Sequence, residues 1–170
     1  DLDSLADMVT FGVLPALMAF RLIAETQLTS LLPGEEVAEF FMHFPTSIAL
    51  LIAVFSAYRL AKFNHDTRQS SSFIGMPTPA NALFWAGLWI GCHNGTYTYF
   101  NAWTLSGLSV LCSFLLVSEI PMFSFKLKSL SWKGNEAQYS LILLSIPFFI
   151  WLKLAALAPF VVIYVLISLV

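Results

Sequence analysis

Fifty consecutive residues, from Gln69 to Ser118, contain no Asp, Glu, Lys or Arg. One membrane-crossing helix needs about 20 apolar residues, so this stretch is too long for a single crossing. His93-Asn94-Gly95 and a nearby group of aromatic residues interrupt it, as is typical of a turn at a membrane interface. We therefore expect two helices here, near Ala80–Cys92 and Ala102–Ser118.

The composition of the whole chain also indicates an integral membrane protein. Hydrophobic residues make up 58% of the 170 residues and charged residues only 11%, whereas soluble domains have about 25% charged residues. Such a surface must face lipid or other helices. The net charge of -2 argues against a nucleic-acid partner, because no basic field is present to bind phosphates in bulk. The spacing of Cys92 and Cys112 matches no metal-binding or redox motif, so we expect both cysteines to be small buried hydrophobic residues.

Four further apolar stretches bring the prediction to about six spans in an all-α transmembrane bundle. They are Met8–Ala24, Phe44–Tyr58 with an extension to Phe63, Ala137–Leu152 and Leu154–Val170. The last two are short and only Lys153 separates them, so two tight spans and a re-entrant pair both remain open. We expect residues 1–170 to form a single membrane-embedded domain.

The basic residues indicate which side of the membrane the loops face. Alternation of six spans puts residues 62–79 and 121–136 on the same side as Asp1, together with six of the eight basic residues. The positive-inside rule therefore predicts that the N-terminus and both loops are cytoplasmic. The six basic residues are Arg59, Lys62, Arg68, Lys126, Lys128 and Lys133.

Two acidic residues, Asp3 and Asp7, stand four positions apart at the start of the first span. Both carboxylates project from one helix face, where like charges repel and an ionised carboxylate near hydrocarbon is costly. A divalent cation such as Mg²⁺ or Mn²⁺ would relieve both costs, since hard cations prefer oxygen ligands. The spacing supports equally well an alternative in which the acids only stabilise the N-terminus of a helix.

Three segments together resemble the CDP-alcohol phosphotransferase family. Asp3-Ser4-Leu5-Ala6-Asp7 is similar to the last part of the family signature, whose glycine and two earlier aspartates would fall upstream of Asp1. Arg59-Leu60-Ala61-Lys62-Phe63-Asn64 and Gly75-Met76-Pro77-Thr78-Pro79-Ala80 are similar to the RLARFN and GLPTPAAA segments of bacterial phosphatidylserine synthases. The resemblance covers residues 1–118. Residues 119–170, a cytoplasmic loop and two C-terminal helices, resemble the family only loosely.

The resemblance implies a bacterial inner-membrane enzyme that transfers a phosphatidyl group from CDP-diacylglycerol to L-serine and releases CMP. By position, Asp3 and Asp7 would bind the divalent metal, and Asp7 would also act as the general base. The resemblance further implies an active site facing the cytoplasm and a homodimer. We expect two further helices upstream of Asp1, carrying the other metal-binding acids, so these 170 residues alone would lack activity. Substrate would be bound by Arg59, Lys62, Asn64 and Thr78.

Alternatives exist for the function and for single residues. Other members of the family use glycerol phosphate or inositol phosphate, although the loop at residues 62–80 has few basic residues for an extra phosphate. A cation-coupled transporter could use Asp3 and Asp7 as its ion site, but transporters usually show paired halves and broken helices. Arg59 and Lys62 could instead anchor a helix at the membrane surface, and Thr78 could belong to a rigid loop.

Overall fold

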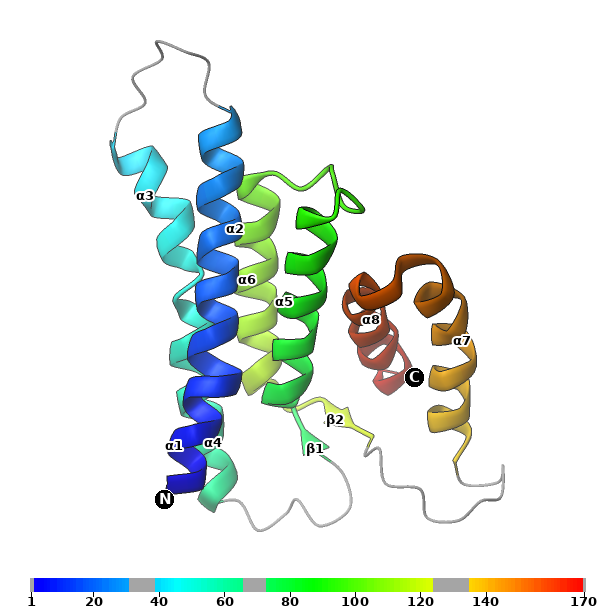
Figure 1. Ribbon diagram of the computed structural model, residues 1–170. Helices are drawn as coiled ribbons and strands as arrows, with labels where there is room; N and C mark the ends of the chain where they lie inside the picture. The colour runs from blue at the N-terminus through cyan, green and yellow to red at the C-terminus, as the bar shows by residue number, and fades with distance from the viewer. Residues whose placement is uncertain (1, 31–38, 66–72, 124–134, 170) are drawn as a thin grey trace.

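The computed structural model describes residues 2–30, 39–65, 73–123 and 135–169, and nearly all of them are helical (Figure 1). The prediction of an α-helical membrane protein is confirmed. In chain order the elements are α1 (Leu2–Met8), η1 (a π-helical turn, Val9–Val13), α2 (Leu14–Ser30), α3 (Glu39–Ile48), α4 (Leu51–His65), β1 (Phe73–Ile74), α5 (Thr78–His93), α6 (Ala102–Val117), β2 (Pro121–Met122), α7 (Glu136–Leu152), η2 (a 3-10 turn, Lys153–Ala156) and α8 (Leu157–Ser168).

Within the described residues, three helical segments are long and apolar enough to cross a membrane: Leu2–Leu28, Phe44–Phe63 and Glu136–Ser168. The apolar helix Ala102–Val117 is shorter. The third segment is a hairpin of α7 and α8 rather than one rod, because the chain reverses at Lys153, where the backbone φ is 52° (Figure 1). The count of about six spans stays a prediction.

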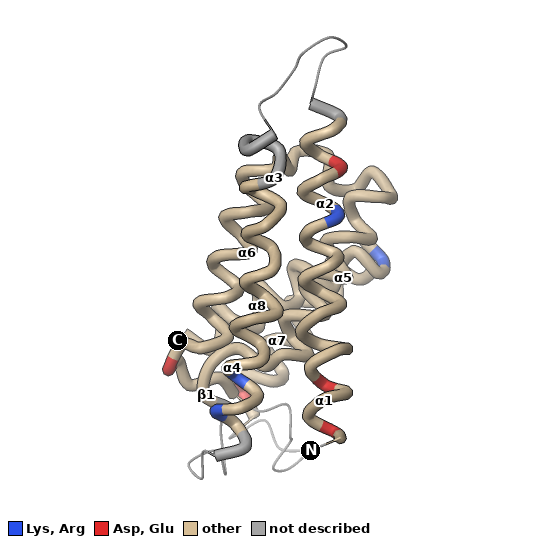
Figure 2. The backbone as a smooth tube through the Cα atoms, turned by 90° about the vertical axis from the view of Figure 1, so that its left-hand side faces the viewer, with Lys and Arg blue, Asp and Glu red and all other residues tan. Residues whose placement is uncertain are grey.

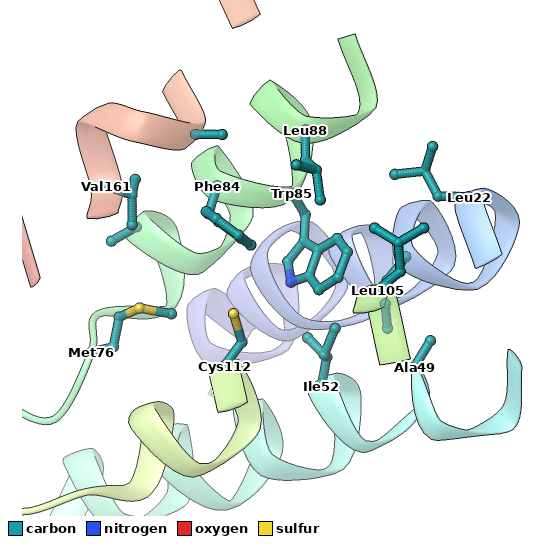
Figure 3. Packing of buried hydrophobic residues seen from close by; sticks show 14 of the residues in the cluster. Leu22, Ala49, Ile52, Met76, Phe84, Trp85, Leu88, Leu105, Cys112 and Val161 are labelled. Carbon is teal, nitrogen blue, oxygen red and sulfur yellow. The ribbon is translucent and has the colours of Figure 1, made fainter. Parts of the chain in front are cut away.

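The core of the bundle lies between α2, α4, α5 and α6. Trp85 of α5 is fully buried there, and Leu22, Ile52 and Leu105 from the other three helices surround it (Figure 3). In a bilayer, lipid tails are as apolar as leucine, so close packing rather than exclusion of water holds such helices together. The core therefore depends on how well these side chains fit one another.

The C-terminal hairpin packs on the opposite side of α5 from α2 (Figure 1). Gly87 allows this contact, because a Cβ atom at that position would collide with the backbone nitrogen of Ala158 in α8. α7 lies outside α8 and exposes apolar side chains, including Leu143 at 65% and Trp151 at 90% exposure. An apolar helix with this exposure is suited to face lipid.

A long-range hydrogen bond ties the turn after α5 to the same hairpin. The Tyr97 hydroxyl donates to the carbonyl oxygen of Ala155 at 3.0 Å. Its ring lies against Gly91, where a Cβ atom would collide with it. Burial raises the pKa of the Tyr97 phenol, and the neighbouring Cys92 thiol raises it further. The hydroxyl therefore stays protonated at neutral pH and remains a donor.

A two-stranded antiparallel sheet closes one end of the bundle. β1 pairs with β2, so that Ile74 lies opposite Pro121. The next residue, Gly75, has a φ of +73° and donates its N–H to the carbonyl of Ile120 at 2.9 Å. The N–H of Met76 then donates to the carbonyl of Leu115 at 2.9 Å. These bonds join the start of α5 to the end of α6.

Candidate functional site

One end of the bundle collects the segments that carry the predicted site residues. α1, the last turn of α4, β1, the first turn of α5 and β2 all lie there (Figure 1). In Figure 2, acidic residues mark the α1 end of the first helical rod and two basic residues mark the same end of α4. A long uncharged stretch separates this end of the rod from Arg21 and Glu25. This arrangement suits a protein whose middle section lies in hydrocarbon.

Asp3 and Asp7 both lie on α1 and are exposed. No group of three or more His, Cys, Asp or Glu side chains within the described ranges could hold a metal ion. A Mg²⁺ ion, however, is often held by only one or two carboxylates and completes its shell with waters and substrate phosphates. The two carboxylates fit that part of a divalent metal site.

Arg59 is buried, with only 7% of its surface exposed. Its Nη2 atom donates to the carbonyl of Gly75 at 3.5 Å, while its Nε atom has no hydrogen-bond partner among the described residues. The side chain lines a cavity of about 10 Å³ together with Lys62, Leu116 and Ser118, which is room for about one water molecule. A guanidinium in this position still has donors to offer a ligand.

The other three predicted substrate-binding residues have different surroundings. Lys62 forms an ion pair with Glu119 at 3.5 Å, in which the Lys62 side chain is 33% exposed. Exposed pairs of this kind add about 0–1 kcal/mol. Thr78 is the first residue of α5 and is buried, at 3% exposure. Asn64 lies in the last turn of α4, and its side chain is outside the described set.

The sequence reasoning missed two buried polar residues near this end, Ser56 of α4 and Asn81 of α5. Both are completely buried. The Oγ atom of Ser56 and both amide atoms of Asn81 lack a hydrogen-bond partner within the described part of the chain. The one signal in the sequence is that each is a single polar residue in an otherwise apolar run, which in a membrane helix often marks function.

The opposite end of the bundle holds a larger, open cavity of about 530 Å³. Glu25 lines it and accepts a hydrogen bond from the Nε atom of Arg21 at 2.9 Å. The Nε2 atom of His93 lies 3.4 Å from the other carboxylate oxygen of Glu25. None of the residues predicted for catalysis lines this cavity.

Comparison with known proteins tests the resemblance seen in the motifs. A Mycobacterium bovis protein named CDP-diacylglycerol–serine O-phosphatidyltransferase is 34% identical over 98% of this chain and 54% of its own length. A Helicobacter pylori protein of the same name is 30% identical over 98% of this chain and 64% of its own length. The chain is similar to proteins of this name over nearly its whole length. A Bacillus subtilis protein with this name is 32% identical over 74% of the chain.

The resemblance to bacterial phosphatidylserine synthases is thereby confirmed, and it extends beyond residues 1–118 into the C-terminal hairpin. The chain spans about half to two thirds of the length of these synthases. No family model matches the chain. No solved structure matches it either.

Proposed function

We propose that the protein transfers the phosphatidyl group of CDP-diacylglycerol to the hydroxyl of L-serine, forming phosphatidylserine and releasing CMP. The similarity to synthases of that name over 98% of the chain carries the proposal. The position of Asp3, Asp7, Arg59 and Thr78 at one end of the bundle supports it.

The reaction needs a base, because the serine hydroxyl has a pKa far above neutrality. In the proposed mechanism the carboxylate of Asp7 accepts the hydroxyl proton as the serine oxygen bonds to the phosphatidyl phosphorus. The bond from that phosphorus to the bridging oxygen breaks, and CMP leaves with the electron pair. Asp7 is exposed, so its proton can pass to water after each turnover.

The proposed metal site uses the carboxylates of Asp3 and Asp7. Mg²⁺ or Mn²⁺ bound there would neutralise phosphate charge, the usual contribution of divalent cations to phosphoryl transfer. Asp3 has the simpler role of a ligand, whereas Asp7 combines metal binding with proton transfer. Substitution of the two residues should therefore have different consequences.

Arg59 is the residue proposed to bind the serine carboxylate. A guanidinium fork matches a carboxylate, and burial strengthens the pair because water does not screen it. Lys62 already pairs with Glu119, so Arg59 is the better placed of these two cations to bind substrate. Thr78 and Asn64 are proposed to contact substrate from the start of α5 and the end of α4.

The single positive charge of Arg59 favours serine over a phosphorylated alcohol as the acceptor. Serine is nearly neutral overall, whereas a phosphorylated alcohol carries about two negative charges at neutral pH. A single buried Arg59 would leave part of that charge unpaired, and an unpaired charge near a membrane is costly. Glycerol phosphate or inositol phosphate as the acceptor is the alternative within the same family.

We further propose a multi-pass protein of the bacterial inner membrane with about six spans, the α1 end in the cytoplasm and a homodimeric assembly. The distribution of basic residues supports the orientation. The α7–α8 hairpin would supply two of the spans.

The test supplies the full-length protein in detergent with CDP-diacylglycerol and each alcohol in turn, and measures CMP. We expect L-serine to be used and glycerol 3-phosphate to be ignored. Asp7→Asn should leave less than about a tenth of the wild-type rate. Glu25→Gln, which changes an acid at the opposite end of the bundle, is the matched control and should retain activity. Faster turnover with glycerol 3-phosphate would overturn the substrate assignment.

A further inference from the structure

Two buried residues, one on α4 and one on α5, have side-chain polar atoms without a hydrogen-bond partner among the described residues, and η1 packs against both of these helices. The Oγ atom of Ser56 and both amide atoms of Asn81 have no hydrogen-bond partner among the described residues, and both side chains are 0% exposed. The Nε atom of Arg59, three residues after Ser56, is also buried and also has no hydrogen-bond partner among the described residues. Buried polar atoms are nearly always paired in proteins, so these atoms call for a ligand or water.

These residues form a layer between the apolar core and the site end of the bundle. Ser56 lies one helical turn from Ile52, and Asn81 one turn from Trp85, in both cases toward the site end. Ile52 and Trp85 point into the same core in Figure 3. Side chains one turn apart share a helix face. Ser56 and Asn81 therefore continue that face toward the site end.

The π-helical turn η1 passes through this layer and packs against both α4 and α5. Its Gly12 is buried, and a Cβ atom there would lie 3.1 Å from the Cβ of Ser56. The missing side chain therefore lets η1 approach Ser56 closely. Single π-helical turns occur often at functional sites, and this one begins two residues after Asp7.

The free groups are complementary to an amino acid. The N–H groups of Arg59 and Asn81 can donate to a carboxylate, while the amide oxygen of Asn81 and the Ser56 hydroxyl can accept from an ammonium group. Gly12, which contacts Ser56, lies five residues beyond Asp7 on the same helical rod. A phosphate monoester of glycerol or inositol has no ammonium group, and its roughly two negative charges would meet a single guanidinium here.

We propose that Asn81 and Ser56, together with Arg59, bind the ammonium and carboxylate groups of the acceptor amino acid and so determine acceptor specificity. This inference rests on the proposed function. The cavity beside Arg59, about 10 Å³, holds roughly one water molecule. Lys62 lines the same cavity and is partly exposed, so an amino acid that entered beside Arg59 would have to displace its side chain.

The test measures the KM values for L-serine and for CDP-diacylglycerol in the full-length Asn81→Ala and Ser56→Ala variants. We expect the KM for serine to rise at least tenfold in Asn81→Ala and about threefold to tenfold in Ser56→Ala. The KM for CDP-diacylglycerol should stay within twofold of wild type. Ser109→Ala is the matched control: Ser109 is equally buried, but its hydroxyl donates to the carbonyl of Leu105 at 2.9 Å, so both KM values should stay unchanged.

A second readout does not depend on turnover. L-Serine should raise the unfolding temperature of the wild-type protein and of Ser109→Ala, but not that of Asn81→Ala. An unchanged KM for serine in both variants of a serine-using enzyme would mean that the layer holds water only, and would overturn this inference alone. A wild type that releases CMP with glycerol 3-phosphate but not with serine would overturn the proposed function and this inference together.

Discussion

Replacement of Gly75 by alanine tests how tightly the short sheet holds the site end of the bundle together. Gly75 has a φ of +73°, and a Cβ atom there would lie 2.7 Å from the carbonyl oxygen of Ser118 and 2.8 Å from that of Leu116. Its own carbonyl accepts the hydrogen bond from Arg59. A shift of this residue would therefore disturb both α6 and the buried guanidinium.

Two costs add at this position. A left-handed φ costs a residue with a Cβ about 1–2 kcal/mol. The two carbonyl oxygens are backbone atoms at the end of α6, so they cannot rotate away as a flexible side chain would. Overpacking of this kind costs about 1–3 kcal/mol. We expect Gly75→Ala to destabilise the protein by about 2–5 kcal/mol.

Alanine variants of two other glycines distinguish the cost of the backbone conformation from the cost of overpacking. Gly95 has a φ of +70° but open space around its Cβ position, so Gly95→Ala should show only the cost of the backbone conformation. Gly107, in α6, has an ordinary φ and open space, so Gly107→Ala should be neutral or stabilise by about 0.5–1 kcal/mol. Unfolding of each variant by SDS titration in mixed micelles gives the ranking. A Gly75→Ala variant no less stable than Gly95→Ala would refute the contact of Gly75 with α6.

The remaining predictions concern the metal, the orientation and the C-terminal hairpin. Asp3→Ala should lose activity that excess Mn²⁺ partly restores, whereas Asp7→Asn should not recover; identical metal titrations of wild type and Asp3→Ala would exclude Asp3 as a ligand. In a cysteine-free background, a cysteine at Thr96 should react with a membrane-impermeant reagent added to intact cells and one at Glu119 should not, and the reverse pattern would invert the topology. Gly87→Leu should detach α8 from α5 and lower the unfolding temperature by several degrees, since a Cβ there meets the α8 backbone; an unchanged temperature would argue against that packing.

The apolar stretches located most of the helices well, because membrane helices end where polar residues begin. The predicted ranges Ala80–Cys92 and Ala102–Ser118 correspond closely to α5 and α6. The first helical rod was predicted too short, since it continues through both of its charged ends. Arg21 pairs with Glu25 one turn later on the same helix, so these charges satisfy each other and the helix need not stop. The sheet of β1 and β2 was not predicted, because strands of two residues have no alternation to detect.

The site could be predicted only in part. From motifs in the sequence, Asp3, Asp7 and Arg59 could be assigned to the same end of the bundle. The burial of Ser56 and Asn81 could not be read from the sequence, since α4 and α5 are apolar on nearly every side and no periodicity shows which face points inward. That information comes from the packing of η1 against α4 and against α5.

The bond between Tyr97 and Ala155 also sets an order for biosynthesis. The two residues are 58 positions apart, so a nascent chain completes α5 and its turn well before the acceptor carbonyl has been synthesised. Until then, lipid rather than protein must cover the face of α5 that carries Gly87. The C-terminal hairpin is therefore the last part of the described chain to pack onto the bundle. Its packing fixes the conformation of the turn after α5, which was synthesised much earlier. A ribosome-arrested chain ending before residue 153 should leave the 94–101 turn open to proteases, while the core around Trp85 is already closed.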